Sequence, residues 1–314
     1  EIGVRLVGSE MCIRDSVWRK ENREVHKFLR AIGFSDITKK DLEMILDEVI
    51  TRPEIMKITK DSEGNEFAEL SGSFAANAGI TVRGTYQEDD SFHMDYYYPY
   101  VFGTSITTNE QIDVEKHAEK ESYAGVCDEV NLGVTLIFYI QNVADYLAET
   151  NRHLSKIHYG AMLAGLSTEG KILCPVVERK KNDVPAIQKN DRHNQLIAQA
   201  REGDEDAIES LTLEDMDTYA LLSQRVMKED IFSIVKSTFM PFGIESDQYT
   251  VLGEIIDCVT MENKLTHEKL YGMKLLCNNI QFDVCINEKD LLGEPAIGRR
   301  FRGNVWMQGN LCLE

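Results

Sequence analysis

The sequence predicts an α+β fold: an antiparallel sheet with flanking helices, then an acidic helical segment and a small antiparallel β-barrel of OB-like type. Apolar residues recur at a helical spacing between residues 26 and 53, and the period changes to two across residues 56–100. Further apolar strands crowd into residues 251–311. Helices around antiparallel strands indicate an α+β domain, and so many strands in so short a stretch favour a barrel.

The first helix is expected in residues 26–34, which read HKFLRAIGF. Phe28, Leu29 and Ile32 can share one face of this short helix. Gly33 can adopt the left-handed conformation that ends a helix, so the helix should stop there.

A second helix should begin after Thr38, a residue type favoured at the N-cap, with Asp41 three residues later. Pro53 ends this helix, because proline cannot continue it. The apolar stripe that would face the core consists of Leu42, Ile45, Leu46 and Val49.

The alternating region predicts an antiparallel meander. Its strands are expected at residues 56–60, 66–70, 80–86 and 92–100. The apolar run 132–140 allows two readings, a strand or the first part of a helix that continues to Leu147. Residues 162–177 predict a hairpin that turns at Thr168-Glu169-Gly170.

A boundary between two domains is expected at residues 179–194, which are polar and locally basic. Residues 25–178 would form the α+β domain, and residues 195–314 the helical segment and the barrel. Residues 201–230 carry ten acids against three bases, which is typical of the solvated faces of short helices.

Residues 1–24 do not read as native protein. Residues 11–16, MCIRDS, can be encoded by a sequence that looks like the transposon end used in sequencing-library preparation, so residues 1–16 resemble translated adapter. Lys20-Glu21 can be encoded by a ribosome-binding sequence, and Val25 by GTG, an alternative start codon. We therefore expect the native chain to start at Val25.

The composition favours a soluble, cytoplasmic protein. The formal net charge is −19, which disfavours nucleic acid as a partner, because phosphate binding relies on clustered Lys and Arg. No apolar run approaches the roughly 18 residues that span a bilayer. The cysteines after residue 25 form no CxxC pair, so we expect buried free thiols rather than disulfides or a zinc site.

Four stretches together resemble a known family: HKFLRAIGFS, AEKESYAGVCDEV, AREGDEDAIESLTLEDMD and DLLGEPAIGRRFRGNVWMQG. They are similar to a family of uncharacterised proteins of anaerobic Gram-positive bacteria, a domain of unknown function of about this length. The resemblance spans residues 25–314, and similar proteins begin with methionine at the place of Val25. It implies no activity, cofactor or catalytic residue.

The densest group of reactive side chains contains His117, Glu121 and Cys127. On a helix, His117 and Glu121 would share a face, which suits a metal pair or a carboxylate-oriented base. No third ligand is identifiable, and an exposed helix rich in Glu and Lys has the same composition. We therefore favour the exposed helix and predict no metal site.

Arg299, Arg300 and Arg302 stand out in an acidic chain. Arginine forks bind carboxylate or phosphate groups, so these three form the candidate contact for an anion or a partner. They could instead pair with the acidic residues 201–230 of the same chain, and this internal role is the one we favour.

The run FHMDYYYPYVF, residues 92–102, could expose a stacking platform for a base or a partner. We favour packing on both faces of a sheet, because the interleaved Lys and Arg of a nucleic-acid platform are missing.

No P-loop, GxGxxG, GxSxG or HExxH motif is present, so no cofactor is expected. We predict a noncatalytic interaction or regulatory protein that binds a macromolecular partner, such as another protein, or a small anion. The alternative is an enzyme of unrecognised type, such as a hydrolase, centred on His117, Glu121 and Cys127. The sequence assigns no oligomeric state.

Overall fold

The computed structural model describes residues 25–116, 121–151, 158–176, 235–243 and 247–313, together with residues 196, 199, 204, 207 and 210. Several features named from the sequence lie outside these residues: the expected extension 1–24, His117, the linker 179–194 and nearly all of the acidic helical segment.

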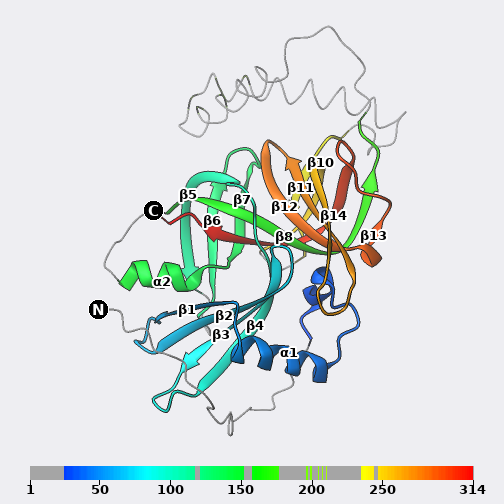
Figure 1. Cartoon of the computed structure of the whole chain (residues 1–314). Helices are drawn as coiled ribbons and strands as arrows, with labels where there is room; N and C mark the ends of the chain where they lie inside the picture. The colour runs from blue at the N-terminus through cyan, green and yellow to red at the C-terminus, as the bar shows by residue number, and fades with distance from the viewer. Residues whose placement is uncertain are drawn as a thin grey trace.

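The described chain is mostly β, with strands in two sheets and few helices, so the α+β prediction fits loosely (Figure 1). The helical elements are η1 (Lys27–Ile32), α1 (Lys39–Thr51), α2 (Val143–Asn151) and η2 (Glu288–Asp290). The four-stranded sheet contains β1 (Ile55–Lys60), β2 (Glu66–Ala75), β3 (Ala78–Tyr86) and β4 (Phe92–Val101). The second sheet contains β5 (Thr108–Lys116), β6 (Tyr123–Glu129), β7 (Val134–Ile140), β8 (His158–Leu173), β9 (Thr238–Pro241), β10 (Gln248–Glu262), β11 (Lys269–Cys277), β12 (Ile280–Asn287), β13 (Leu291–Leu292) and β14 (Arg300–Leu311).

The first two helices begin and end where the sequence predicts. Thr38 caps α1, since its hydroxyl accepts a hydrogen bond from the Asp41 backbone N–H at 3.2 Å. Gly33 ends η1 in the left-handed region, with φ at 93°. The first helix is a 3-10 helix rather than an α-helix, and it is capped by His26.

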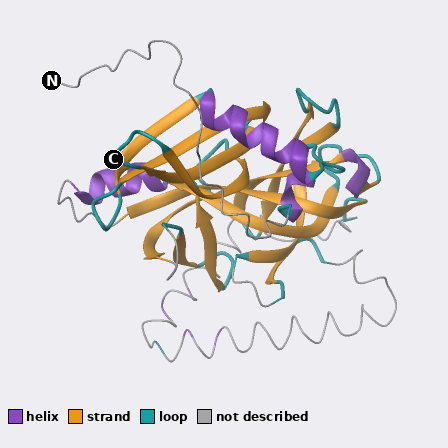
Figure 2. Cartoon of the chain, turned by 90° about the horizontal axis from the view of Figure 1, so that it is seen from below, coloured by secondary structure: helices purple, strands orange, loops and turns teal. Residues whose placement is uncertain are grey.

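The strands β1 to β4 form an antiparallel meander in chain order, which confirms the prediction. On one face Leu70 lies opposite Val82, and both belong to the same buried cluster as Leu46 of α1. Helix α1 crosses this face, as the view from below shows (Figure 2). On the other face Glu69 lies opposite Arg83. The sheet therefore presents an apolar face to α1 and a polar pair to the rest of the molecule.

The aromatic run in β4 packs rather than forming an exposed platform. Tyr98 and Tyr100 are only 3% and 2% exposed. The Tyr98 ring lies 4.8 Å from that of Tyr139 in β7, and the Tyr100 ring stacks on Phe102 at 4.3 Å. The burial of these rings agrees with the packing interpretation.

The hairpin expected in residues 162–177 is wrong. Residues 158–173 form one continuous strand, β8, which pairs antiparallel with β14 along most of its length. Gly170 lies inside the strand, where a Cβ atom would collide with the ring of Phe301. This glycine is needed for close approach to a neighbouring side chain and not for a turn.

Strand β8 crosses the middle of the second sheet beside β14 (Figure 1). Five strands of this sheet close a ring through the pairings β8–β14, β14–β10, β10–β11, β11–β12 and β12–β8. Of these pairs only β12–β8 is parallel. One strand of the ring thus comes from the N-terminal side of the expected linker. The OB-like barrel and the division at residues 179–194 stay predictions.

The ambiguous apolar run resolves into a strand and then a separate helix. Val134–Ile140 is β7, which pairs antiparallel with β6 and parallel with the end of β14. Helix α2 begins at Val143 and buries Val143, Ala144 and Leu147. Strand β6, which is next to β7 in the chain, and strand β14, which is distant in the sequence, supply the pairing partners that decide this point.

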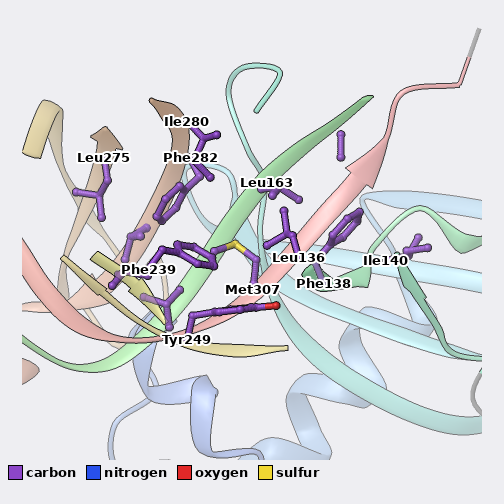
Figure 3. Packing of buried hydrophobic residues seen from close by; sticks show 14 of the residues in the cluster. Leu136, Phe138, Ile140, Leu163, Phe239, Tyr249, Leu275, Ile280, Phe282 and Met307 are labelled. Atoms are coloured by element: carbon purple, nitrogen blue, oxygen red, sulfur yellow. The ribbon is translucent and has the colours of Figure 1, made fainter. Parts of the chain in front are cut away.

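The interior of the second sheet is filled by large apolar side chains (Figure 3). This cluster includes Phe239 of β9, Tyr249 of β10 and Phe282 of β12. Leu136 and Phe138 of β7 belong to it as well. All cysteines after residue 25 are free thiols, as predicted, but only Cys127, Cys277 and Cys285 are buried, whereas Cys258 and Cys312 are half-buried and Cys174 is exposed. Among the described residues, no helix is both long and apolar enough to cross a membrane.

Candidate functional site

A cleft of about 550 Å³ lies beside η1, where the first helix meets β8 and η2. Both charged and apolar side chains face it, and its volume is typical of small-molecule sites. Its lining residues are Val25, His26, Lys27, Arg30, Phe34, Ser35, Ile37, Thr168 and Asp290.

Packing of η1 places the cleft. Its apolar face is buried through Phe28, Leu29 and Ile32, the three residues that the sequence assigns to one face. The ring of Phe28 stacks on Trp306 of β14 at 5.2 Å. Asn263, in the connection between β10 and β11, donates a hydrogen bond to the Ile32 carbonyl at 2.7 Å. The helix is therefore held on two sides, and its outer face remains at the cleft.

Arg30 is the principal charged group of the cleft. Its Nε donates to both carboxylate oxygens of Asp290, at 2.7 and 2.6 Å. The Asp290 side chain is 6% exposed, whereas that of Arg30 is 45% exposed. The hydrogen bond to Asp290 raises the pKa of Arg30, so the guanidinium stays charged.

Two sets of hydrogen-bond donors face the cleft without a protein partner in the described part of the chain. They are the terminal Nη groups of Arg30 and the hydroxyl of Thr168. Lys27 adds a second positive charge, with its Nζ 3.3 Å from Gln248 Oε1. Asp290 is the acid among the lining residues, and the negative charges of Asp36 and Glu268 also act on Arg30.

The rim beside Ser35 is built around Glu268. Burial alone would raise the pKa of Glu268, but hydrogen bonds from Lys289, Ser35 and Asn287 outweigh it and lower the pKa. The ionised carboxylate thus organises the rim, with Lys289 Nζ 2.7 Å from Glu268 Oε1. Its role here is structural, because its bonds go to neighbouring protein groups.

His26 lines the cleft as a neutral ring. Burial lowers its pKa to about 4, and the charge of Lys27 adds to this effect. The ring lies 5.1 Å from that of Trp306 and 6.0 Å from that of Phe28. At neutral pH His26 therefore contributes an uncharged surface.

Two of the three residues of the enzyme hypothesis, Glu121 and Cys127, lie in the described part of the chain and have separate environments, and the hypothesis itself stays a prediction. Cys127 is buried in the core, and burial raises the pKa of its thiol to about 12. Glu121 instead bonds to Ser62, Lys116 and the hydroxyl of Tyr123. His117 lies outside the described residues.

The three arginines have separate environments. The buried Arg300 donates to the carbonyls of Cys174, at 2.9 and 2.8 Å, and of Val235, at 2.5 Å. Arg299 is exposed and donates to the Glu294 carbonyl at 2.7 Å. Arg302 lies in β14 opposite Lys171 of β8. Whether these arginines contact residues 201–230 or a partner stays a prediction, since nearly all of that segment is outside the described residues.

Sequence reasoning missed the cleft residues Arg30, Thr168 and Asp290. Arg30 and Asp290 are 260 residues apart in the chain, so no local pattern could pair them. The available signal was an arginine on the polar side of a short amphipathic helix, which is common. Across the described ranges, no group of three or more His, Cys, Asp and Glu side chains could hold a metal ion.

A protein-family model described as "Domain of unknown function, E. rectale Gene description (DUF3881)" matches residues 29–309. The match agrees with the domain of unknown function that the sequence motifs resemble. No curated protein and no solved structure matches the chain.

Proposed function

We propose that this chain, which belongs to the DUF3881 family, is a noncatalytic cytoplasmic protein that binds a small anion in the cleft beside η1. The observation that carries the proposal is the fixed orientation of Arg30. Asp290 holds the guanidinium by Nε and leaves both Nη groups available at the cleft. A planar fork held in this way suits a carboxylate or phosphate group, which it can bind through two parallel hydrogen bonds.

The other lining groups support the same chemistry. The Thr168 hydroxyl can donate a further hydrogen bond, and Lys27 adds charge without a fixed fork. Nothing in the cleft resembles a nucleophile with an adjacent base, because His26 is held neutral by burial and Ser35 is bonded to Glu268. Binding without chemistry is therefore the function that this geometry supports best.

The test is calorimetric titration of inorganic phosphate into the full chain at low ionic strength. We expect saturable binding, weakened at least about tenfold in Arg30→Gln, since each charge-assisted bond contributes about 1.5–3 kcal/mol. Arg52→Gln is the matched control, because Arg52 is an exposed arginine at the end of α1 and does not line the cleft.

Thr168→Val serves as a second variant that leaves the Arg30–Asp290 pair intact, and it should weaken binding several-fold. The absence of saturable phosphate binding, or equal affinity in Arg30→Gln and Arg52→Gln, would contradict the proposal. Thermal unfolding of each variant shows whether the fold is retained.

A further inference from the structure

We infer that strand β1 is a docking edge for a second copy of this chain, and that the two β1 strands pair antiparallel about a two-fold axis at Lys57. The inference goes beyond the anion site and does not depend on it. It is drawn from the edge position of β1, from the exposure of its apolar side chains and from the charges that one register brings together.

Strand β1 is an edge of the four-stranded sheet (Figure 1). Within the described ranges it pairs with β2 alone, whereas the opposite edge, β4, packs against η1 and β8. An open edge presents backbone N–H and C=O groups to which another strand can add. Of the two edges, β1 is therefore the one that can receive a further strand.

The backbone groups of Met56 and Ile58 point away from β2. The N–H of Asp61 donates to the Asn65 carbonyl across the β1–β2 hairpin, so Asp61 points toward β2. Because backbone groups alternate in direction along a strand, those of Lys60, Ile58 and Met56 point to the outer edge. A side chain of α2 donates to the Lys60 carbonyl at 2.8 Å and occupies that end. Met56 and Ile58 are thus the residues left to pair with a further strand.

Three exposed aliphatic side chains belong to this short strand. Met56 and Ile58 are 49% and 51% exposed. They lie on the face that α1 covers, because their partners on β2 belong to the cluster buried under that helix. Ile55 is 44% exposed on the opposite face, which it shares with Lys57. Apolar surface on both faces of an edge strand is stabilised when another strand covers it.

A two-fold axis at Lys57 gives a self-complementary register. Met56 then pairs with Ile58 of the second copy, and each pair exchanges its backbone N–H and C=O bonds, since both residues point to the outer edge. An axis at Ile58 would instead place Met56 opposite Lys60 of the second copy, an apolar side chain against a charged one. The apolar match therefore selects the axis at Lys57.

The same register brings opposite charges together. At each end of the ladder the exposed Lys60 comes opposite the exposed Glu54 of the second copy. Glu54 also lies 3.4 Å from Lys264, but this ion pair is exposed on both sides, so its exchange costs little. At the centre the two Lys57 side chains are neighbours, and each is bound to Asp145 of its own α2 at 2.6 Å, which compensates its charge. A second copy thus fits this edge in charge as well as in apolar surface.

The test is analytical ultracentrifugation of the full chain over a range of protein concentrations. We expect a reversible monomer–dimer equilibrium, because an interface built on one strand is small. Ile58→Lys should raise the dimer dissociation constant at least about tenfold, since it sets a charge against Met56 of the second copy. Ile106→Lys is the matched control, because Ile106 is an exposed isoleucine in the connection between β4 and β5.

Charge reversal tests the register. Lys60→Glu and Glu54→Lys should each weaken the dimer several-fold, and the double variant should recover it, because acid and base then exchange places. A chain that stays monomeric at every concentration would overturn the inference, as would equal dissociation constants in Ile58→Lys and Ile106→Lys or a double variant that does not recover. Thermal unfolding shows whether each variant is folded. Phosphate titration of Ile58→Lys should match that of the unchanged chain, so failure of the dimer and failure of the anion site are distinguishable.

Discussion

The guanidinium of Arg83 and the carboxylate of Glu69 form an ion pair in the interior, with Arg83 Nε 2.7 Å from Glu69 Oε1. Arg83 is fully buried. It also donates to the Tyr139 hydroxyl of β7 and to the carbonyls of Ile140 and Gln141. The second Glu69 oxygen accepts from the first turn of α2. One pair on the four-stranded sheet therefore joins it to a strand of the second sheet and to a helix.

Replacing Arg83 should destabilise the protein strongly. Arg83→Leu leaves the Glu69 carboxylate buried without its partner, and breaking such a pair costs about 3–5 kcal/mol. Denaturant unfolding of Arg83→Leu, Glu69→Gln and the double variant measures the coupling. We expect the double variant to lose less stability than the sum of the single variants. Additive losses would mean that the two groups are not coupled. Arg52→Leu is the control and should leave the free energy of unfolding nearly unchanged.

The buried thiols should be unreactive in the folded protein. Burial raises the pKa of Cys127, Cys277 and Cys285 to about 12 each, so little thiolate exists at pH 8. Cys174 is exposed. In a Cys12→Ser background, Cys174→Ser should remove the fastest phase of reaction with a thiol reagent. The half-buried Cys258 and Cys312 should react more slowly, because burial raises the pKa of each.

The same measurement bears on the enzyme hypothesis. A nucleophilic Cys127 would react with the reagent rapidly and would lose this reaction in Cys127→Ser. A fast phase that disappears in Cys127→Ser would contradict the buried, protonated thiol and would support a catalytic role.

Arg300 and Arg299 should differ sharply in their effect on stability. Arg300 binds the Cys174 and Val235 carbonyls from a buried position, so Arg300→Gln leaves these acceptors without their charged donor and should cost about 2–4 kcal/mol. Arg299→Gln should change the free energy of unfolding by less than about 0.5 kcal/mol, because the side chain is exposed. Equal effects in denaturant unfolding would refute this assignment.

Hydrogen exchange at residues 172–174 and 235–237 locates the effect of the Arg300 change. Faster exchange at both segments in Arg300→Gln is expected, because one guanidinium holds both. Faster exchange at one segment alone would mean that the other is held by different contacts.

His26 should make folding stability depend on pH. Its pKa is about 4 in the folded protein and about 6.5 in an unfolded chain, so the unfolded state binds more protons between these values. Stability is therefore lost as pH falls from 6.5 toward 4. Between pH 7 and pH 5 this group accounts for a loss of about 2 kcal/mol. In His26→Phe the free energy of unfolding should fall by about 2 kcal/mol less over this pH range. An unchanged pH dependence would contradict the buried neutral ring.

Local signals in the sequence predicted the helix starts and stops well. The Thr38 cap, the left-handed Gly33 and the alternation through β1 to β4 act within a few residues, and all appear in the structure. The hairpin expected around Gly170 is wrong, because the local signal there allows two interpretations. A glycine suits a turn and a close packing contact equally well, and only the position of Phe301 distinguishes them.

The sequence by itself determined the acidic composition, the first helices, the meander and the absence of familiar cofactor motifs, because these depend on residue type and short-range spacing. Only the tertiary structure decided which polar groups meet. Arg300 reaches a carbonyl 126 residues away, and Arg30 reaches a carboxylate 260 residues away. The candidate cleft belongs to this second class, since its charge and its walls come from segments that chain folding alone brings together.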